Sequence, residues 1–251
     1  MHGWTGNILK VDLAGGRAWR ETIPTELLHV YLGGRGLGVR LLRDSFRVDP
    51  LDPQMPLIFA VGPLCGTQAP TAARLTVVSR SPLTSTVYDC SSGGLFAWRL
   101  KAAGLDAVFM FGESPRPVAL VIQGEGAELI PAGDLWGKTV HETVAALADR
   151  GSVAAIGPAG ENGVLFANIM MGEGNSVGRG GLGAVMGMKR LKAVVVNGDT
   201  AVGIADRRRF DHARQDVMRL FRASPVIFGE LGIAEYGTPA LVDLMRQRRM
   251  A

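Results

Sequence analysis

Hydrophobic side chains in the first 200 residues alternate with polar ones or form short apolar runs, and both patterns are typical of β-strands. Residues 6–13 alternate in this way, and the segment RAWRETI, which follows the Gly15-Gly16 turn, is the expected hairpin partner. Further strands are predicted where apolar, β-branched runs end at Gly or Pro. These are PLIFAVG (56–62), ARLTVVSRS (73–81), DAVFMFG (106–112), the hairpin pair PVALVIQ (117–123) and GAELI (126–130), SVAAIG (152–157) and LKAVVVNG (191–198).

Helical patterns are short in this part of the chain. Thr139 and Glu142 have the spacing of a capping box, which predicts a helix in VHETVAALADR that stops at Gly151. Two further short helices are expected, at residues 26–31 and 39–46.

The pattern changes to helix after Asp206. A basic helix is predicted from there to Ser224-Pro225, followed by a Gly-rich loop and a second helix in ALVDLMRQRR. We therefore expect an α/β (α+β) fold, with a β-rich domain over residues 1–205 and a helical segment over residues 206–251.

Composition narrows the class of protein. With 251 residues, 47% hydrophobic and 20% charged, the chain can bury a large core. The net charge of +4 is concentrated in residues 207–209 and 246–249, which is typical of solvated helix faces and does not indicate nucleic-acid binding. No apolar run approaches the roughly 18 residues of a membrane span, and the N-terminus lacks the pattern of a signal peptide, so a cytoplasmic location is expected.

Glycines gather around one arginine in GEGNSVGRGGLGAVMGMKRLKAVVVNG, residues 172–198. Five of the ten residues from Gly178 to Gly187 are glycine, and Arg179 lies among them. Glycine costs about 0.5–1 kcal/mol relative to alanine inside an element, so something must offset it. Either the glycines adopt positive φ in tight turns, or they let backbone amides approach an anionic ligand while Arg179 supplies charge.

Other glycine-rich stretches are less favourable for phosphate. GDLWGKT (133–139) has one residue too few for a Walker A loop, and AAIGPAGENG (154–163) has the wrong spacing for a dinucleotide loop and carries Glu161. GGRGLGVRLL (33–42) echoes the first cluster, and AVGPLCG (60–66) echoes AIGPAGENG (155–163). These echoes indicate either a duplicated strand-and-loop unit with two glycine-arginine loops or chance.

A further stretch combines polar groups. Arg74 comes just before a predicted strand, and Ser91, Ser92 and two glycines follow it. Hydroxyls, bare amides and an arginine describe an anion or heterocycle site, whereas a hairpin with solvated polar ends explains them equally well.

The order of these motifs resembles the N-terminal part of the tungsten-containing aldehyde ferredoxin oxidoreductase family, from about residue 3 to residue 244. The motifs are GGRGLG, GPLCGTQAPTAAR, SRSPLT, SSGG, GLDAV, WGK, IGPAGEN, GRGGLGAVMG with KRLKAV, and YGT. The resemblance implies two sheets related by a pseudo-two-fold, on which a bis-pterin tungsten cofactor lies and which helical domains cover. The segment 206–251 is then the start of a truncated second domain.

The resemblance also implies roles for single residues. Arg179 and Gly180, with Leu182 through its backbone, match positions that hold the pterin phosphates, and Arg74 and Gly93 match pterin contacts in the other half. In the family a magnesium ion bridges the phosphates through loop carbonyls. Ser91 stands where the best-known members carry asparagine, and it is the expected cofactor and magnesium contact through its backbone carbonyl.

The chain departs from the family in its cysteines. The family's C-x2-C-x3-C run and later cysteine for a [4Fe–4S] cluster have no match, because the chain contains only Cys65 and Cys90. We therefore expect the cluster, and the helical domains with the substrate pocket, on a second subunit. The expected reaction is oxidation of an aldehyde to a carboxylic acid at tungsten or molybdenum, with electrons passing to a ferredoxin-like acceptor. The alternative is a non-catalytic scaffold or truncated remnant, and no catalytic residue is identified.

Overall fold

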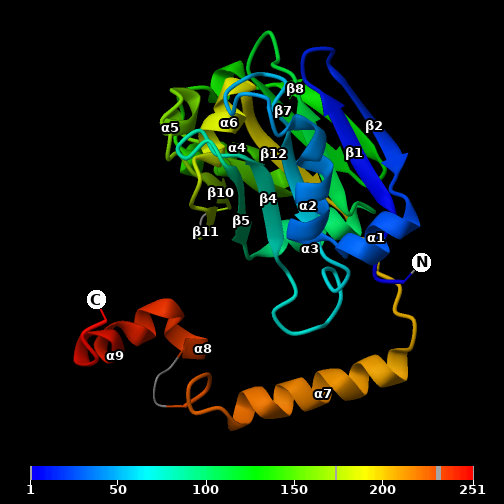
Figure 1. Ribbon diagram of the computed structural model, residues 1–251, viewed down its shortest axis with the longest axis vertical. Coiled ribbons are helices and arrows are strands. Elements are labelled where there is room, and N and C mark those ends of the chain that lie inside the picture. Colours follow the sequence, from blue (N-terminus) through cyan, green and yellow to red (C-terminus); the bar gives the residue numbers. More distant parts are fainter. Residues whose placement is uncertain (1, 173, 230–232, 251) are drawn as a thin grey trace. The chain divides into compact units, whose positions relative to one another are not determined.

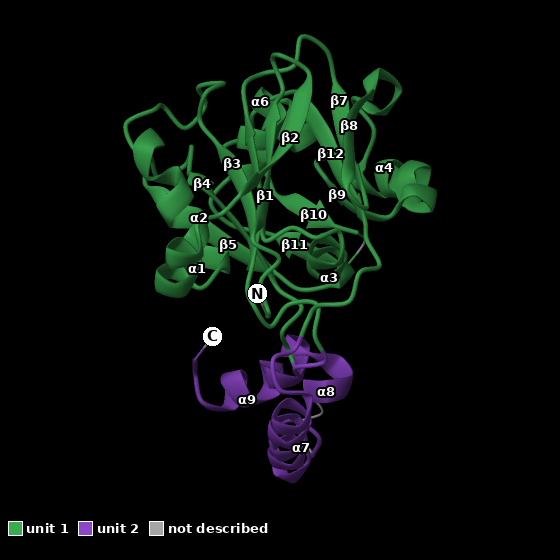
Figure 2. Cartoon of the chain, turned by 90° about the vertical axis from the view of Figure 1, so that its right-hand side faces the viewer, with its two compact units in different colours: residues 1–67, 71–203 green, residues 68–70, 204–251 purple. Residues whose placement is uncertain are grey.

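The computed structural model describes residues 2–172, 174–229 and 233–250. The chain divides into two compact units, residues 1–67 with 71–203 and residues 68–70 with 204–251, which Figure 2 colours separately. The second unit contains the helices α7 (Arg207–Ala223), α8 (Ile233–Tyr236) and α9 (Val242–Gln247) and a 3-10 turn at Thr238–Leu241. Asp206 caps α7 by accepting a hydrogen bond from the Arg209 amide at 2.9 Å, so the predicted basic helix is confirmed.

The first unit contains two six-stranded sheets (Figure 1). One consists of β1 (Asn7–Asp12), β2 (Arg17–Thr22), β3 (Leu57–Val61), β4 (Leu75–Arg80), β5 (Val87–Ser92) and β6 (Ala107–Phe111). The other consists of β7 (Val118–Gln123), β8 (Gly126–Pro131), β9 (Ser152–Ala155), β10 (Ile169–Met171), β11 (Asn175–Val177) and β12 (Leu191–Asn197). Every predicted strand and both predicted hairpins are confirmed, whereas β5, β10 and β11 were not predicted.

The two sheets have the same construction. Their strand orders are β2-β1-β6-β3-β4-β5 and β8-β7-β12-β9-β10-β11. In each sheet one pair is parallel, β1 with β6 and β7 with β12, and the other four pairs are antiparallel. This correspondence confirms the expected pseudo-two-fold arrangement of two halves.

The correspondence between the two sheets shows which of the two sequence echoes reflects a duplication. The loops that begin at Gly62 and Gly157 follow the equivalent strands β3 and β9, so that echo reflects the duplication. The other echo, between GGRGLG and GRGGLG, does not reflect the duplication. GGRGLG enters α2 (Gly34–Leu42) between β2 and β3, whereas GRGGLG precedes α6 (Leu182–Met188) between β11 and β12. The true counterpart of GRGGLG is SSGGLF, residues 91–96, which precedes α3 (Leu95–Ala102) between β5 and β6.

The remaining helices of the first unit are α1 (Thr25–Tyr31), α4 (Val140–Leu147) and α5 (Pro158–Glu161), with 3-10 turns at Arg43–Ser45, Gly133–Leu135 and Ala148–Arg150. The capping box of α4 is confirmed. The helix expected at 39–46 begins five residues earlier, at Gly34. A Cβ atom at Gly36 would lie 2.5 Å from the Tyr31 carbonyl oxygen, so the glycines allow α1 and α2 to approach closely.

The main core lies between the two sheets. It contains inward side chains of both, such as Phe59 and Leu120, together with Leu100 of α3 and Met186 of α6. The outer faces of the sheets are covered by α1 with α2 and by α4. At the sheet edges β2 lies beside β8, and β5 lies beside β11. The edge strands β5 and β11 of the two halves therefore meet, and each leads directly into a glycine-containing loop.

Candidate cofactor-binding site

Equivalent glycine loops follow β5 and β11. Gly93-Gly94 leads into α3, and Gly180-Gly181 leads into α6. Gly94 has φ +102°, Gly180 +79° and Gly181 +67°, values that side-chain-bearing residues rarely adopt. The first reading of the glycine cluster is therefore confirmed, because Gly180 and Gly181 take positive φ between β11 and α6.

Each loop packs against the edge strand, β5 or β11, of the opposite half. A Cβ atom at Gly180 would overlap the ring of Tyr88, which lies on β5. A Cβ atom at Gly94 would lie 3.0 Å from Nδ2 of Asn175, which lies on β11, and one at Gly93 would lie 3.6 Å from its Oδ1. The two loops are therefore held by residues at equivalent places in the two strands.

The carbonyls at the ends of β5 and β11 are held in equivalent ways. Arg74, just before β4, donates from Nη2 to the Ser91 carbonyl oxygen at 3.4 Å. Asn168, just before β10, donates to the Gly178 carbonyl oxygen at 3.1 Å when its side-chain amide is oriented with the nitrogen toward that carbonyl. The Ser91 hydroxyl is hydrogen bonded to Thr76 Oγ1 at 3.0 Å, so a ligand at Ser91 would meet the backbone.

The sequence-predicted residues lie in these two loops, at the ends of the elements that flank them or, for Arg74, just before β4 in contact with the Ser91 carbonyl. Arg74, Ser91 and Gly93 belong to the first half, and Arg179, Gly180 and Leu182 belong to the second. Arg179 is exposed and forms no hydrogen bond or ion pair with any residue that the structure describes. Leu182 is fully buried and belongs to the main core, so its side chain is not available to a ligand.

The second glycine-arginine loop is different. Nε of Arg35 lies 2.7 Å from Oδ2 of Asp89 on β5, so this guanidinium already has an anionic partner. Of the two explanations left open for the echo between GGRGLG and GRGGLG, the structure therefore supports chance. The predicted cofactor arginines of the two halves are Arg74, which lies before β4, and Arg179, which lies in the loop after β11.

The stretches GDLWGKT and AAIGPAGENG, which were rejected as phosphate loops, are linked by the carboxylate of Glu161. Glu161 lies 2.5 Å from Nζ of Lys192, and both side chains are buried. The other carboxylate oxygen of Glu161 accepts a hydrogen bond from the Gly137 amide at 2.8 Å. The Gly137 amide of GDLWGKT and the ammonium of Lys192 therefore already have an anionic partner.

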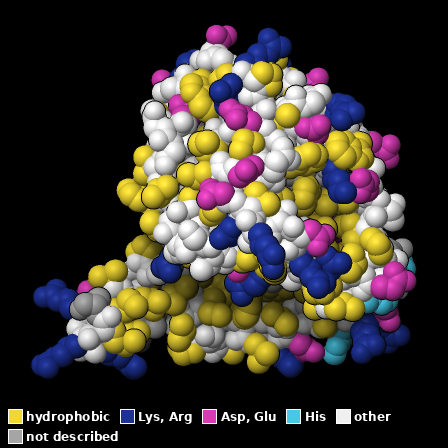
Figure 3. Space-filling view, turned by 45° about the horizontal axis from the view of Figure 1, so that its top comes forward, with side chains coloured by type: hydrophobic (Ala, Val, Ile, Leu, Met, Phe, Trp, Pro, Cys, Tyr) yellow, Lys and Arg dark blue, Asp and Glu magenta, His cyan; other side chains and the backbone are white. Residues whose placement is uncertain are grey.

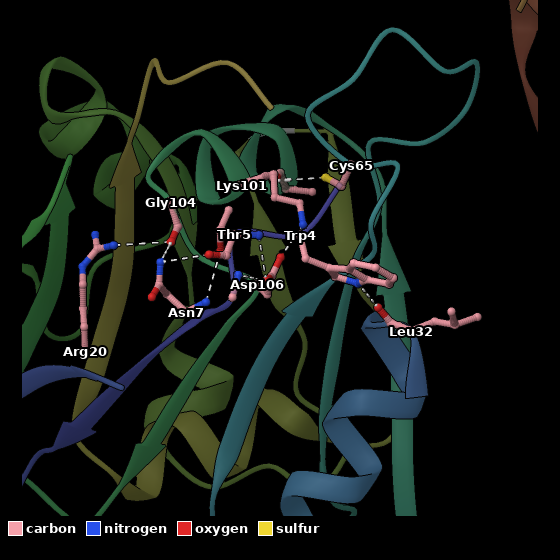
Figure 4. Close-up of polar contacts among 11 residues, drawn as sticks. Trp4, Thr5, Asn7, Arg20, Leu32, Cys65, Lys101, Gly104 and Asp106 are labelled. Carbon is pink, nitrogen blue, oxygen red and sulfur yellow. Dashed lines mark hydrogen bonds and ion pairs between the residues drawn. The ribbon is translucent and has the colours of Figure 1, made fainter. Parts of the chain in front are cut away.

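A second buried ion pair fastens the N-terminal segment to the first half (Figure 4). Lys101 of α3 pairs with Asp106, whose other oxygen accepts hydrogen bonds from the amides of Thr5 at 3.0 Å and Gly6 at 2.7 Å. Nearby, Cys65 Sγ donates to the Ala97 carbonyl, and burial raises the pKa of this thiol to about 11. A thiol that holds its proton so firmly is a packing residue rather than a nucleophile or metal ligand.

The described residues bring no three His, Cys, Asp or Glu side chains into a group that could hold a metal ion. Within the same ranges no helix has the length and apolar character needed to cross a membrane. On the face drawn in Figure 3, hydrophobic side chains are exposed among charged groups of both signs.

Sequence reasoning missed Tyr88, Asn168 and Asn175. The signal for two of them was present, because the spacing from Gly93 to Gly180 equals the spacing from Tyr88 to Asn175. Pairing SSGGLF with GRGGLG would have revealed it. The hydrogen bond of Asn168 had no sequence signal.

Residues 8–198 match the family described as "Aldehyde ferredoxin oxidoreductase, N-terminal domain". Since this match covers most of the chain, the protein belongs to the aldehyde ferredoxin oxidoreductase family.

Individual relatives agree. The chain is 42% identical to the tungsten-containing aldehyde ferredoxin oxidoreductase of Pyrococcus abyssi and 41% identical to that of Thermococcus kodakarensis, in each case over 98% of this chain and 42% of the relative. Among solved structures, it matches a chain of the active-site complex BamBC of benzoyl coenzyme A reductase in complex with 1,5-dienoyl-CoA. That match has a TM-score of 0.84 and 38% identity, and it covers 88% of this chain and 35% of the other. The 251 residues thus span less than half the length of these relatives.

Proposed function

We propose that the two glycine loops hold the two pterin phosphates of a tungsten or molybdenum bis-pterin cofactor. The observation that carries this proposal is the repetition of one arrangement in both halves, with positive-φ glycines and a fixed strand-end carbonyl in each, at the place where β5 meets β11. The unpaired guanidinium of Arg179 fits a phosphate, because charge-assisted hydrogen bonds need a donor without another anionic partner.

Each predicted residue has a role in this proposal. Arg179 binds one phosphate through its guanidinium, while Gly180 and Leu182 approach the cofactor through their backbone. Arg74 and Gly93 contact the cofactor in the first half. The Ser91 carbonyl, oriented by Arg74, is the proposed ligand of a magnesium ion between the phosphates. Oxygen donors of this kind suit magnesium.

When bound, the cofactor supplies the two-electron redox chemistry at its metal, and this chain supplies binding and orientation. The proposed reaction is oxidation of an aldehyde to a carboxylic acid in the cytoplasm, with the electrons leaving through a [4Fe–4S] cluster to a ferredoxin-like acceptor. With only Cys65 and Cys90, these residues cannot supply four thiolates. The cluster and the groups that line the substrate pocket therefore come from polypeptide outside these 251 residues, on our proposal from a second subunit.

Relatives carry names that refer to aldehydes, to aliphatic sulfonates and to a coenzyme A reductase. A non-catalytic, cofactor-binding scaffold is the second candidate, because every residue implicated here lies at the cofactor and none is a group that performs chemistry on a substrate.

Replacing Arg179 by lysine tests the phosphate role. The change keeps the charge but removes the bidentate fork, and hydrogen bonds to charged groups contribute about 1.5–3 kcal/mol each. When cofactor is limiting, its content in the assembled protein should fall about tenfold, since a factor of ten corresponds to about 1.4 kcal/mol. The melting temperature of the cofactor-free chain should not change.

The matched control is Arg35→Lys, which alters another glycine-flanked arginine whose partner is Asp89. It should leave the cofactor content unchanged. Full cofactor content in Arg179→Lys together with a lowered melting temperature of the cofactor-free chain would show that Arg179 is a structural residue.

A further inference from the structure

Tyr88 and Asn175 occupy equivalent positions in the two halves. Each lies on an edge strand, β5 or β11, five residues before the first glycine of the Gly93-Gly94 or Gly180-Gly181 pair. Neither side chain faces the loop of its own half in the contacts described above. The Tyr88 ring lies against Gly180 of the second half, and the Asn175 amide lies against Gly93-Gly94 of the first.

The contacts are close enough to define the shape of the loops. The Tyr88 ring occupies the space where a side chain at position 180 would begin, so the backbone at Gly180 rests directly on the ring. A rigid ring with two side-chain dihedrals loses little conformational entropy as such a support. In the first half, a Cβ atom would lie 3.0 Å from the Asn175 amide at Gly94 and 3.6 Å from it at Gly93. The smaller Asn175 side chain is therefore a looser support.

We infer that Tyr88 and Asn175 are reciprocal positioning residues, each of which holds the glycine loop of the opposite half in the form that binds a phosphate. This inference rests on the proposed function in naming phosphate as the ligand, whereas the crossed support itself concerns the loops alone. Because each support comes from the other half, neither loop would have its binding form in an isolated half.

Because each side chain contacts the loop of the opposite half, each substitution should affect the glycine amides of the opposite half. Glycine-selective 15N labelling of the 251-residue chain lets the amides of Gly93, Gly94, Gly180 and Gly181 be followed one by one by NMR. Tyr88→Ala should shift and broaden the Gly180 and Gly181 resonances, and Asn175→Ala should do the same at Gly93 and Gly94. Tyr88→Phe, which keeps the ring, should retain the Gly180 and Gly181 resonances of the unmodified chain.

Val87→Ala is the matched control, because Val87 is the neighbour of Tyr88 on β5 and points to the other face of the strand. It should leave Gly180 and Gly181 unchanged. If Tyr88→Ala disturbs Gly93 and Gly94 as much as Gly180 and Gly181, or disturbs neither pair, the inference is wrong. If the alanine variant does not fold, Tyr88→Phe still decides the matter. A folded phenylalanine variant in which the Gly180 resonance has moved would contradict support by the ring.

Inorganic pyrophosphate, titrated into the same samples, separates this inference from the proposed function. Tyr88→Ala should weaken the response of Gly180 to pyrophosphate about five- to tenfold, and Tyr88→Phe should not. If the unmodified chain shows no response to pyrophosphate and its assembled form carries no cofactor, the proposed function fails, while the crossed NMR pattern still decides whether Tyr88 and Asn175 position the loops. If the unmodified chain responds and Tyr88→Ala responds equally, the positioning role is refuted and the proposed function stands.

Discussion

Lys189 follows α6 and is buried, with 1% of its surface exposed. Its ammonium donates to the Pro53 carbonyl oxygen at 2.8 Å. Burial lowers the pKa of Lys189 from its ordinary value of 10.5 to about 7, although Asp52 and Glu113 oppose the shift. We predict that replacing Lys189 with methionine removes a pH-dependent part of the folding free energy.

The sign follows from proton binding. Between pH 7 and pH 10.5 the unfolded chain keeps a proton on Lys189 that the folded chain has largely lost, so the contribution of Lys189 to stability rises with pH over this window and is flat below it. Each pKa unit corresponds to about 1.36 kcal/mol, so the Lys189 contribution should improve by about 2 kcal/mol between pH 7 and pH 9. For a domain of this size that is about 4–8 °C in melting temperature.

The assay is urea unfolding of the parent chain and of Lys189→Met at pH 7, 8 and 9. The difference in unfolding free energy between the two should change by about 2 kcal/mol over this range, with the parent gaining as pH rises. The Pro53 carbonyl keeps a second donor in the Gly112 amide at 2.8 Å, so the variant leaves no unpaired oxygen. The raised pKa of Cys65 acts in the opposite sense above pH 9, but it is common to both proteins and cancels. A difference that stays constant with pH would refute this reasoning.

Three further changes test the packing around the site. Glu161→Gln leaves the buried Lys192 charge without its partner and should cost about 3–5 kcal/mol in urea unfolding; a loss below about 1 kcal/mol would contradict a buried pair. Thr139→Ala removes the capping hydrogen bond of α4 and should cost about 1 kcal/mol by the same assay, whereas no loss would mean that the cap is not formed in solution. Gly181→Ala places a Cβ into the Leu165 carbonyl at positive φ and should cost at least about 1–3 kcal/mol, and an unchanged melting temperature would contradict the described loop.

The sequence was most informative where a local signal agreed with the tertiary structure. Apolar, β-branched runs predicted the central strands because both faces of those strands are buried, as in the fully buried LIFAV of β3. Thr139 and Glu142 predicted the start of α4 because a capping box is a local arrangement.

The strands at the site carried no such signal. VYDCSS in β5 is polar and partly exposed, and β10 and β11 are three residues each, so their strand conformation depends on pairing with neighbours. The meeting of β5 with β11, and therefore the crossed contacts of Tyr88 and Asn175, follows from the packing of two sheets. Glycine alone did not distinguish a helix-packing loop such as 33–36 from the loop at Gly180, since glycine allows close approach of any neighbour.

The central claim is that this chain holds a bis-pterin cofactor, and the most direct test is elemental and pterin analysis of the protein purified from its native source with whatever polypeptide accompanies it. We predict tungsten or molybdenum together with two pterins for each copy of the chain, and loss of most of both in Arg179→Lys expressed in the same host under limiting metal. A complex that includes the proposed second subunit but contains neither metal nor pterin would contradict the account.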